Sequence, residues 1–326
     1  MKVLPQKQRT ATGVRKKRVI VLSGPTASGK TSLSLSLAQS LGGEIVSADS
    51  MQVYQGMDVG TAKASDADQT LIAHHLIDIR AIEEPFNVAE FYDLCQTALK
   101  DITRRENVPI VVGGSGFYIH TLLYGPPAGP PSVPDVRDAL ERQMREMGPA
   151  VLYERLQMLD PDYAATISEN DRHKIIRALE IMAITERKVS DFPKPDRALE
   201  QEWDFRCWFI YYPKETLYAR IDARCDEMLR LGFLEEVKRL DGEGLRLNTS
   251  AAQAIGYRQA LEYLDSGQTS GDYEKFVTEF KKASRHFAKR QFTWFRKEPL
   301  FRWLNLEELP LERIQELILQ DFEQGE

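Results

Sequence analysis

The run GPTASGKT, residues 24–31, most constrains the fold because it satisfies the pattern G-x-x-x-x-G-K-[ST]. It follows the short apolar run Val19–Leu22 and precedes a segment with leucines at helical spacing. A glycine-rich turn between a buried strand and a helix N-terminus directs backbone N–H groups at phosphate oxygens. The run therefore predicts a phosphate-binding loop in which Lys30 supplies positive charge and Thr31 suits a magnesium ion.

The rest of the chain alternates short apolar runs with helical patterns, which is typical of a parallel sheet. Further strands are expected at 43–50, 74–79, 109–116, 207–212 and 301–305. Two proline-bearing segments, 124–137 and 189–205, enclose a stretch that looks helical throughout. We therefore predict an α/β fold, with a P-loop NTPase-like parallel sheet flanked by helices and a mostly helical inserted domain. The expected parts are a disordered basic arm (1–17), a catalytic core (18–125 and 201–310), the inserted domain (126–200) and a C-terminal helix or tail (311–326).

Composition and charge are ordinary for a soluble enzyme. The formal net charge is −6, and no apolar run is long enough to span a bilayer. The three cysteines are scattered, which disfavours a zinc site and a disulfide framework. We expect a cytoplasmic protein without membrane association, in which any contact with nucleic acid depends on local basic patches.

One such patch is the expected helix 273–297, whose segment 281–297 has no acidic residue. Its apolar stripe consists of Phe280, Phe287 and Trp294. Its basic stripe consists of Lys281, Arg285 and Lys289. Seven-residue spacing predicts that the apolar stripe, including Phe287 and Trp294, faces the core. The basic stripe fits either a solvated face or phosphate contacts, and the lack of compensating acids favours phosphate.

The loop pattern alone does not identify the phosphorylated ligand. A P-loop kinase also needs a carboxylate near magnesium. Asp49, at the end of the second expected strand, is a candidate, and Asp78 is a weaker one. No second nucleotide-recognition motif is visible, so a kinase is possible but not required.

Several segments together resemble the tRNA dimethylallyltransferase family, bacterial type, in order and spacing. These segments are GPTASGKT, SADSMQVYQGMDVGTAKA, HHLIDI, PIVVGGSGFYI, AIGYRQ and KRQFTWFRK. They extend from about residue 19 to residue 303, nearly the whole chain. The chain has no C-terminal Cys/His zinc module, which we would expect in eukaryotic relatives.

The resemblance implies transfer of a dimethylallyl group from dimethylallyl diphosphate to the exocyclic N6 amine of an adenosine. That adenosine lies on the 3′ side of the anticodon in tRNAs that read codons starting with U. The implied partners are the tRNA anticodon stem-loop and dimethylallyl diphosphate, with Mg²⁺ as cofactor, and we expect a monomer. The alternatives are an adenylate (AMP or ADP) isopentenyltransferase and, further off, a P-loop small-molecule kinase. A free nucleotide needs neither the helical insertion nor the basic helix.

The resemblance also implies roles for residues near the loop. The diphosphate would be held by Gly24, Pro25, Thr26, Ala27, Ser28, Gly29, Lys30 and Thr31. The catalytic set would be Asp49, Lys30, Thr31 and Arg224. Asp49 would be the general base, although a carboxylate that organises magnesium also fits. Arg224, and less clearly Arg220 one turn earlier, would contact the diphosphate; alternatively both are solvated and paired with Asp222 or Asp226.

The tRNA contacts that the resemblance implies are Asp49, Ser50, Met51, Gln52, Ser115, Arg137, His173, Lys174, Ile175, Ile176, Arg177, Gln253, Ala254, Ile255, Gly256, Tyr257, Arg258, Lys289, Arg290, Gln291, Phe292, Thr293, Trp294, Phe295 and Arg296. Ser115 replaces a threonine usual in the family and keeps its hydroxyl. The pair His173-Lys174 departs from the Gln-Arg of the family, whereas Arg177 matches. His74, His75 and His120 fit no metal-ligand spacing and are expected to be structural.

Overall fold

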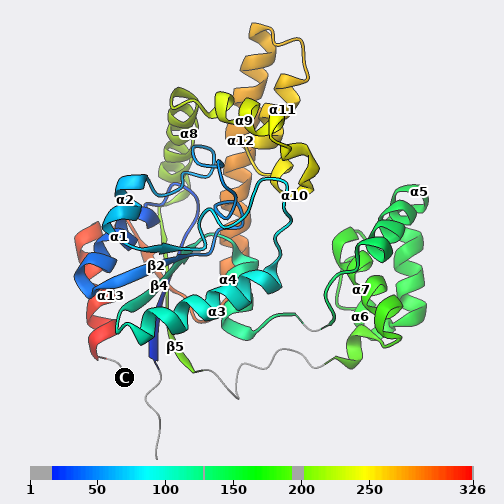
Figure 1. Cartoon of the computed structure of the whole chain (residues 1–326), viewed down its shortest axis with the longest axis horizontal. Helices are drawn as coiled ribbons and strands as arrows, with labels where there is room; N and C mark the ends of the chain where they lie inside the picture. The colour runs from blue at the N-terminus through cyan, green and yellow to red at the C-terminus, as the bar shows by residue number, and fades with distance from the viewer. Residues whose placement is uncertain (1–16, 128, 193–201, 325–326) are drawn as a thin grey trace, which may run out of the picture. The chain divides into compact units, whose positions relative to one another are not determined.

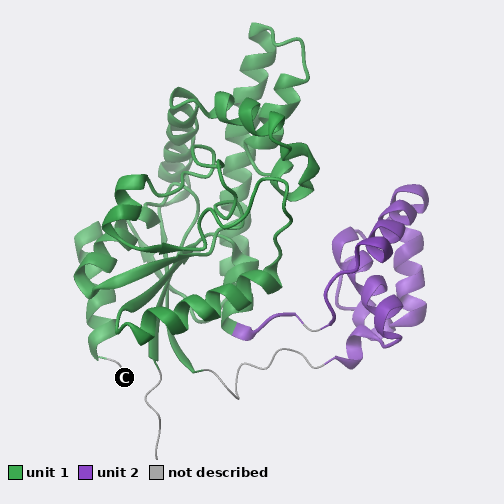
Figure 2. Cartoon of the chain, viewed as in Figure 1, with its two compact units in different colours: residues 1–123, 200–326 green, residues 124–199 purple. Residues whose placement is uncertain are grey.

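The computed structural model describes residues 17–127, 129–192 and 202–324. Residues 1–16 of the expected basic arm lie outside this range, and Lys17 already belongs to the first strand. The described chain forms two compact units, Met1–Leu123 with Glu200–Glu326 and, separately, Tyr124–Leu199 (Figure 2). The first unit contains the phosphate loop, and the second begins two residues before the segment 126–200 that is expected to be an insertion and otherwise coincides with it closely.

The first unit is built on a six-stranded sheet with the order β3-β2-β4-β1-β5-β6. The strands are β1 (Lys17–Ser23), β2 (Gly43–Ser47), β3 (His74–His75), β4 (Val108–Gly113), β5 (Trp203–Tyr211) and β6 (Arg302–Asn305). Every pairing is parallel, so the predicted α/β fold is confirmed. The expected strand 74–79 ends at His75, because Leu76 and Asp78 adopt positive φ angles of 61° and 56°.

Helices cover both faces of this sheet (Figure 1). The covering helices are α1 (Lys30–Leu41), α2 (Asp66–Leu71), α3 (Val88–Arg104), α4 (Gly116–Tyr124) and α13 (Leu311–Gln324). Ile20 and Leu22 of β1 pack in one cluster with α1 and α13. Val19 and Val21 alternate with them, and all four are fully buried. The sheet is therefore covered on both sides, which explains its apolar strands.

A helical group lies beyond the carboxyl ends of the strands (Figure 1). It comprises α8 (Lys214–Arg230), α9 (Phe233–Gly242), α10 (Thr249–Ala252), α11 (Tyr257–Leu264) and α12 (Ser270–Phe295), with a 3-10 turn at Leu245–Leu247. Its core joins Phe233, Tyr257 and Phe280 to Val53 and Met57 of the segment after β2. This segment is therefore fixed by the helical group as well as by the sheet.

The second unit is helical. It consists of α5 (Pro134–Leu159), α6 (Pro161–Ala164), α7 (Arg172–Thr185) and a 3-10 turn at Val189–Asp191. The α5 ribbon breaks at Gly148, whose φ is 80°, and resumes at Pro149. Its own small core includes Leu140, Leu156 and Ile175. The unit thus has the packing of an independent body, and its role stays a prediction.

Glycine is required where the central strands end. A Cβ on Gly113 would lie 2.1 Å from the carbonyl oxygen of Ala48, and one on Gly24 would lie 2.4 Å from the carbonyl oxygen of Ile210. Both carbonyls are backbone atoms of neighbouring segments of the sheet, so neither can turn aside. The start of the phosphate loop therefore approaches β5, and the end of β4 approaches the segment after β2, more closely than side chains would allow.

We expect Gly113→Ala to lower the free energy of unfolding by about 1–3 kcal/mol, because the added methyl overlaps backbone. Denaturant titration followed by circular dichroism measures this. Gly242→Ala is the matched control, since a Cβ there meets nothing within 4 Å. The control should stay within about 1 kcal/mol of the parent. Equal stability of Gly113→Ala and the parent would contradict the close approach.

Candidate active site

A cavity of about 900 Å³ lies at the carboxyl ends of the central strands. Its wall includes Thr26–Thr31 of the phosphate loop, Asp49–Gln52 after β2, and Ser115 after β4. It also includes Arg220 and Arg224 of α8, Gln253–Ile255, Tyr257, Arg290 and Gln291. Residues that are up to 265 positions apart are thus brought to one site, where open α/β sheets place their ligands. Gly24, Pro25 and Arg258 do not line it.

The phosphate loop has the shape that an anion requires. Gly29 has a φ of 91° and is the residue before α1, so the loop turns directly into the helix N-terminus. Lys30 Nζ donates to the carbonyl oxygens of Gly24 at 2.9 Å and Pro25 at 2.8 Å. The hydroxyl of Ser28 is buried and has no hydrogen-bond partner among the described residues. A buried donor left in this way is available to a ligand oxygen.

Positive charge is concentrated in the cavity. Burial, followed by the nearby Arg224 guanidinium, lowers the pKa of Lys30 to about 7, while Asp49 acts in the opposite direction. Burial also lowers the pKa of Arg224, again opposed by Asp49. One carboxylate therefore faces two cations that are only partly hydrated. An anionic ligand would relieve this repulsion, as the predicted diphosphate role of Arg224 requires.

Asp49 lies two residues beyond β2, at the start of a loop that we call the acceptor loop, residues 48–63. Its Oδ1 accepts a hydrogen bond from the Met51 amide at 2.9 Å, which orients the carboxylate. The Ser115 hydroxyl accepts from the Ser50 amide at 3.2 Å. Gln52 is fixed at both ends, since it accepts from the Ser47 hydroxyl and donates to the Thr61 carbonyl. The loop is therefore preorganised next to the phosphate loop.

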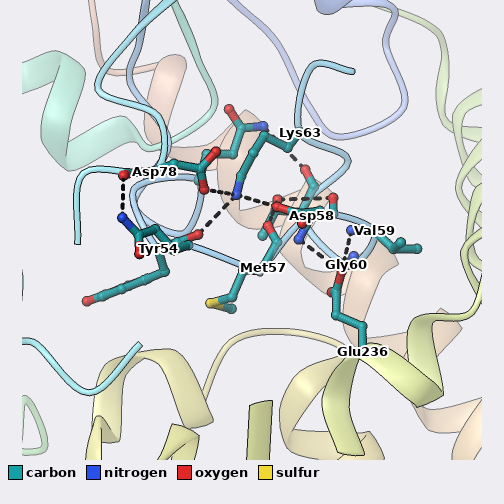
Figure 3. A network of polar contacts seen from close by, with 12 residues as sticks. Tyr54, Met57, Asp58, Val59, Gly60, Lys63, Asp78 and Glu236 are labelled. Carbon is teal, nitrogen blue, oxygen red and sulfur yellow. Dashed lines mark hydrogen bonds and ion pairs between the residues drawn. The ribbon is translucent and has the colours of Figure 1, made fainter. Parts of the chain in front are cut away.

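Two buried charged side chains hold the far part of the acceptor loop (Figure 3). Lys63, whose side chain is 3% exposed, donates to the Tyr54 carbonyl at 3.0 Å and pairs with Asp58 and Asp78. Glu236 of α9 accepts from the amides of residues 58, 59 and 60 at 3.0, 2.7 and 3.1 Å. Asp78, the weaker candidate for a carboxylate near magnesium, pairs with Lys63 and does not line the cavity, so the structure does not support that role. Sequence reasoning missed Lys63 and Glu236. Glu236 binds mainly backbone amides, and the two carboxylates that pair with Lys63 lie 5 and 15 positions away in the sequence.

The two arginines of α8 differ in their surroundings. Arg220 Nε donates to the Ala27 carbonyl at 3.0 Å, and its guanidinium lies over the ring of Tyr212. Arg224 lines the cavity near Asp49. Neither pairs with Asp222 or Asp226 in any described contact, because those carboxylates pair with Arg285 and Lys281 of α12. The alternative that both arginines are solvated ion-pair partners is therefore wrong.

The same ion pairs correct the expected basic stripe. Lys281 lies 2.6 Å from Asp226, and Arg285 pairs with Asp222. The compensating acids belong to α8, where the sequence of α12 could not reveal them. Of the stripe, Lys289 remains exposed. It lies with Arg290, Thr293, Trp294 and Lys297 around a second hollow of about 310 Å³.

The expected apolar stripe is correct only at its first position. Phe280 and Phe287 both line the cavity, but Phe280 is buried, Phe287 is only half-buried, and Trp294 is 41% exposed. Trp294 makes edge contacts with Phe117 and His120 of α4. The prediction that Phe287 and Trp294 are core residues is therefore wrong. The long helix passes beside the cavity, so its inner face is only partly covered by other side chains.

Four of the expected tRNA contacts are buried aliphatic or aromatic side chains. Ile175 and Ile176 belong to the core of the second unit, and Phe295 to an aromatic cluster with Phe209 and Phe301. Tyr257 is 1% exposed, and its hydroxyl donates to Glu236 at 2.6 Å. These side chains support their neighbours and present no surface to RNA, so contact through them is not supported.

The remaining expected contacts of the second unit are accessible. His173 and Lys174 are exposed at the start of α7. Arg177 and Arg137 both pair with the buried carboxylate of Glu180, at 2.8 and 3.7 Å. Glu180 also accepts from the Val133 amide at 3.0 Å. The carboxylate of Glu180 therefore orients both guanidiniums, which remain partly exposed.

The three histidines expected to be structural differ. His75 pairs with the buried Glu44, and His120 with Glu298. His74 lines the cavity, and its Nδ1 lies 2.7 Å from the Ile72 carbonyl. Burial lowers the pKa of His74, which favours the neutral imidazole. In the described residues no group of three or more His, Cys, Asp or Glu side chains could hold a metal ion.

Comparison with known proteins decides the family. Residues 52–298 match the family described as IPP transferase. The tRNA dimethylallyltransferase of Protochlamydia amoebophila (strain UWE25) is 57% identical over 308 residues, which cover 94% of this chain and 90% of that protein. The tRNA dimethylallyltransferase of Chlamydia pneumoniae is 48% identical over 312 residues, with coverage of 94% and 90%. The chain belongs to the IPP transferase family.

Solved structures agree with this assignment. A tRNA isopentenylpyrophosphate transferase of Staphylococcus epidermidis has a TM-score of 0.69 at 37% identity, covering 95% of this chain and 100% of that one. A eukaryotic dimethylallyltransferase acting on tRNA has a TM-score of 0.78 at 30% identity, covering 95% and 80%. The predicted resemblance is confirmed. Among the described residues of this IPP transferase, no helix is long and apolar enough to cross a membrane.

The low pKa of Lys30 makes anion binding depend on pH. The lysine of the free protein loses its charge as pH rises through about 7. A bound polyanion favours the charged form, so binding takes up a proton and weakens above that pH. The parent should bind pyrophosphate more tightly than Lys30→Met. We expect the ratio of their two affinities to fall by about tenfold between pH 6.5 and pH 8.5.

Calorimetric titration with magnesium pyrophosphate measures this difference. The comparison with Lys30→Met cancels the ionisation of pyrophosphate itself, which both proteins encounter equally. A constant advantage across this pH range would contradict a lysine that titrates in the free protein.

Proposed function

We propose that this protein is a tRNA dimethylallyltransferase that uses dimethylallyl diphosphate as donor. The acceptor is the N6 amine of the adenosine on the 3′ side of the anticodon, in tRNAs that read codons starting with U. The observation that carries the proposal is the single cavity shared by the phosphate loop and the acceptor loop. A donor anion and an oriented carboxylate thus lie within reach of one substrate atom. The names of the relatives favour tRNA over free AMP as acceptor.

The donor end of the site is the phosphate loop. Its amides, the Ser28 hydroxyl, Lys30 and Arg224 would bind the diphosphate. As the bond between the donor C1 and its oxygen breaks, that oxygen leaves with the electron pair. Cations and N–H groups fixed before the reaction stabilise the charge that develops there.

A magnesium ion fits the donor end. The Thr31 side chain lines the cavity at the first turn of α1, and the described residues supply no complete metal site of their own. The ion would therefore share Thr31 with oxygens of the diphosphate, as in other phosphate loops. When bound, magnesium offsets charge on the leaving group.

The acceptor end is Asp49. As N6 of the adenosine forms its bond to C1, one proton of the amine passes to the carboxylate, to which we assign Oδ2. Oδ1 already accepts from the Met51 amide and keeps the group oriented. The products are the N6-dimethylallyl adenosine, free diphosphate and a protonated Asp49, so atoms and charge balance.

RNA contact is proposed for two surfaces. On α12 it involves the exposed side chains of Lys289, Arg290, Thr293, Trp294 and Arg296. In the second unit it involves His173, Lys174, Arg177 and Arg137. The adenosine must leave its stack to reach a cavity, which requires a grip on the flanking stem-loop. We further propose that the protein acts as a monomer in the cytoplasm.

Incubation with labelled dimethylallyl diphosphate and Mg²⁺ tests the function directly. We expect label to enter an anticodon stem-loop that carries adenosine 3′ to the anticodon. The same stem-loop with guanosine at that position should stay unlabelled, because it lacks the N6 amine. Labelling of AMP but not RNA would favour the adenylate alternative. Phosphoryl transfer from ATP without any prenyl product would favour a kinase.

Asp49→Asn tests the proton acceptor, because the amide keeps the shape and cannot take the proton. We expect kcat to fall by about 10²–10⁴-fold, while the Kd for the stem-loop stays within about threefold. Asp93→Asn, on the exposed side of α3, is the control and should retain full turnover. Recovery of Asp49→Asn by excess Mg²⁺ would instead assign Asp49 to the metal. Normal kcat in the variant would exclude both roles.

A further inference from the structure

The turn Gly113–Gly116, between β4 and α4, contacts both the acceptor loop and the helix α12. A Cβ on Gly113 would meet the Ala48 carbonyl, so this turn packs on the start of the acceptor loop. Ser115 holds that loop by accepting from the Ser50 amide. A Cβ on Gly114 would lie 2.1 Å from Gln291 Nε2, and one on Gly116 would lie 2.3 Å from Trp294. The helix α12 therefore rests directly on the backbone of the turn.

Gln291 joins this turn to the phosphate loop. Its Oε1 accepts a hydrogen bond from the Thr26 amide at 3.0 Å, and its Nε2 donates to the Gly114 carbonyl at 3.0 Å. The residue is only 5% exposed. Both ends of the amide are engaged with backbone, so the side chain is directed inward, whereas its neighbours Arg290 and Thr293 are exposed.

The phosphate loop needs such support because part of its backbone is strained. Ala27 has a φ of 63°, a left-handed conformation that costs an alanine about 1–3 kcal/mol. Gln291 holds the amide just before it, and Arg220 Nε holds the Ala27 carbonyl at 3.0 Å. The strained residue is thus fixed from both sides by side chains of two different helices. Without a ligand, these contacts keep the loop in its anion-binding shape.

We propose that Gln291 is a positioning residue for the phosphate loop and not a contact to tRNA, although the family resemblance places it among the tRNA contacts. Gln291 supports donor binding because it holds the Thr26 amide, whereas the exposed residues of the same helix contact the RNA. The inference depends on the proposed function in one respect, namely that the ligand of the phosphate loop is a diphosphate. It predicts that loss of Gln291 separates donor affinity from RNA affinity.

Gln291→Met tests this, since methionine keeps the length of the side chain and removes both hydrogen bonds. The probes are magnesium pyrophosphate, followed by calorimetry, and a fluorescent anticodon stem-loop, followed by anisotropy. We expect the Kd for pyrophosphate to rise about tenfold, as the loss of two hydrogen bonds allows. The Kd for the stem-loop should stay within twofold, and KM for the donor should rise more than kcat falls.

Two further variants make the result specific. Gln268→Met makes the same substitution in the exposed turn before α12 and should leave both Kd values unchanged. Gln291→Glu keeps the acceptor for Thr26 and loses the donor to Gly114, so it should also weaken pyrophosphate binding. If Gln291→Met does not fold, Gln291→Glu carries the test. Failure of both to fold would assign Gln291 to folding and overturn the proposal.

Other outcomes also overturn it. An unchanged Kd for pyrophosphate would do so, whatever happens to RNA binding. A weakened stem-loop Kd with normal pyrophosphate binding would restore Gln291 to the tRNA surface. These measurements do not depend on prenyl transfer. A parent protein that binds pyrophosphate without transferring a dimethylallyl group would refute the proposed function and leave the inference on Gln291 standing.

Discussion

The close approach of backbone segments at the carboxyl ends of β1, β2 and β4 governs the rest of the site. A Cβ on Gly113 would lie 2.1 Å from the carbonyl oxygen of Ala48, and one on Gly114 would lie 3.4 Å from the carbonyl oxygen of Gly24. Because these segments nearly touch, the phosphate loop and the acceptor loop open into one cavity instead of two. Everything that the site can do chemically follows from this proximity, since a group transfer needs the reacting atoms of donor and acceptor about 3–3.5 Å apart.

The second constraint is electrostatic. Lys30 and Arg224 share a poorly hydrated space with the carboxylate of Asp49, and burial lowers the pKa of both cations. The repulsion between the two cations lowers the stability of the free protein, and a bound polyanion relieves it. In the proposed mechanism, the carboxylate that eases the repulsion is also the one that takes the proton. The site therefore uses Asp49 in both states, and few groups within it are independent of the others.

Much of this could be predicted from the sequence. The phosphate loop and the strands around it follow local patterns, because apolar β-branched runs and glycine turns act over a few residues. The partners of a charged side chain do not follow such patterns. The acids that neutralise Lys281 and Arg285 lie on α8, about sixty positions earlier, and Glu236 binds amides of the acceptor loop. The prediction that Trp294 is a core residue fails for a related reason. A regular apolar stripe on a helix does not reveal how far along the helix other elements cover it.

In the proposed mechanism, the helix α12 serves two substrates. Its inward residue, Gln291, touches the phosphate loop, and its ion pairs to α8 fix the helix that carries Arg220 and Arg224. Its outward residues, among them Lys289 and Arg290, are exposed and basic. Because a helix is rigid, RNA bound to its outer face would have a fixed position relative to a donor bound near its inner face. The geometry of transfer then depends on the packing of one helix, and the turn Gly113–Gly116 is where that packing is set.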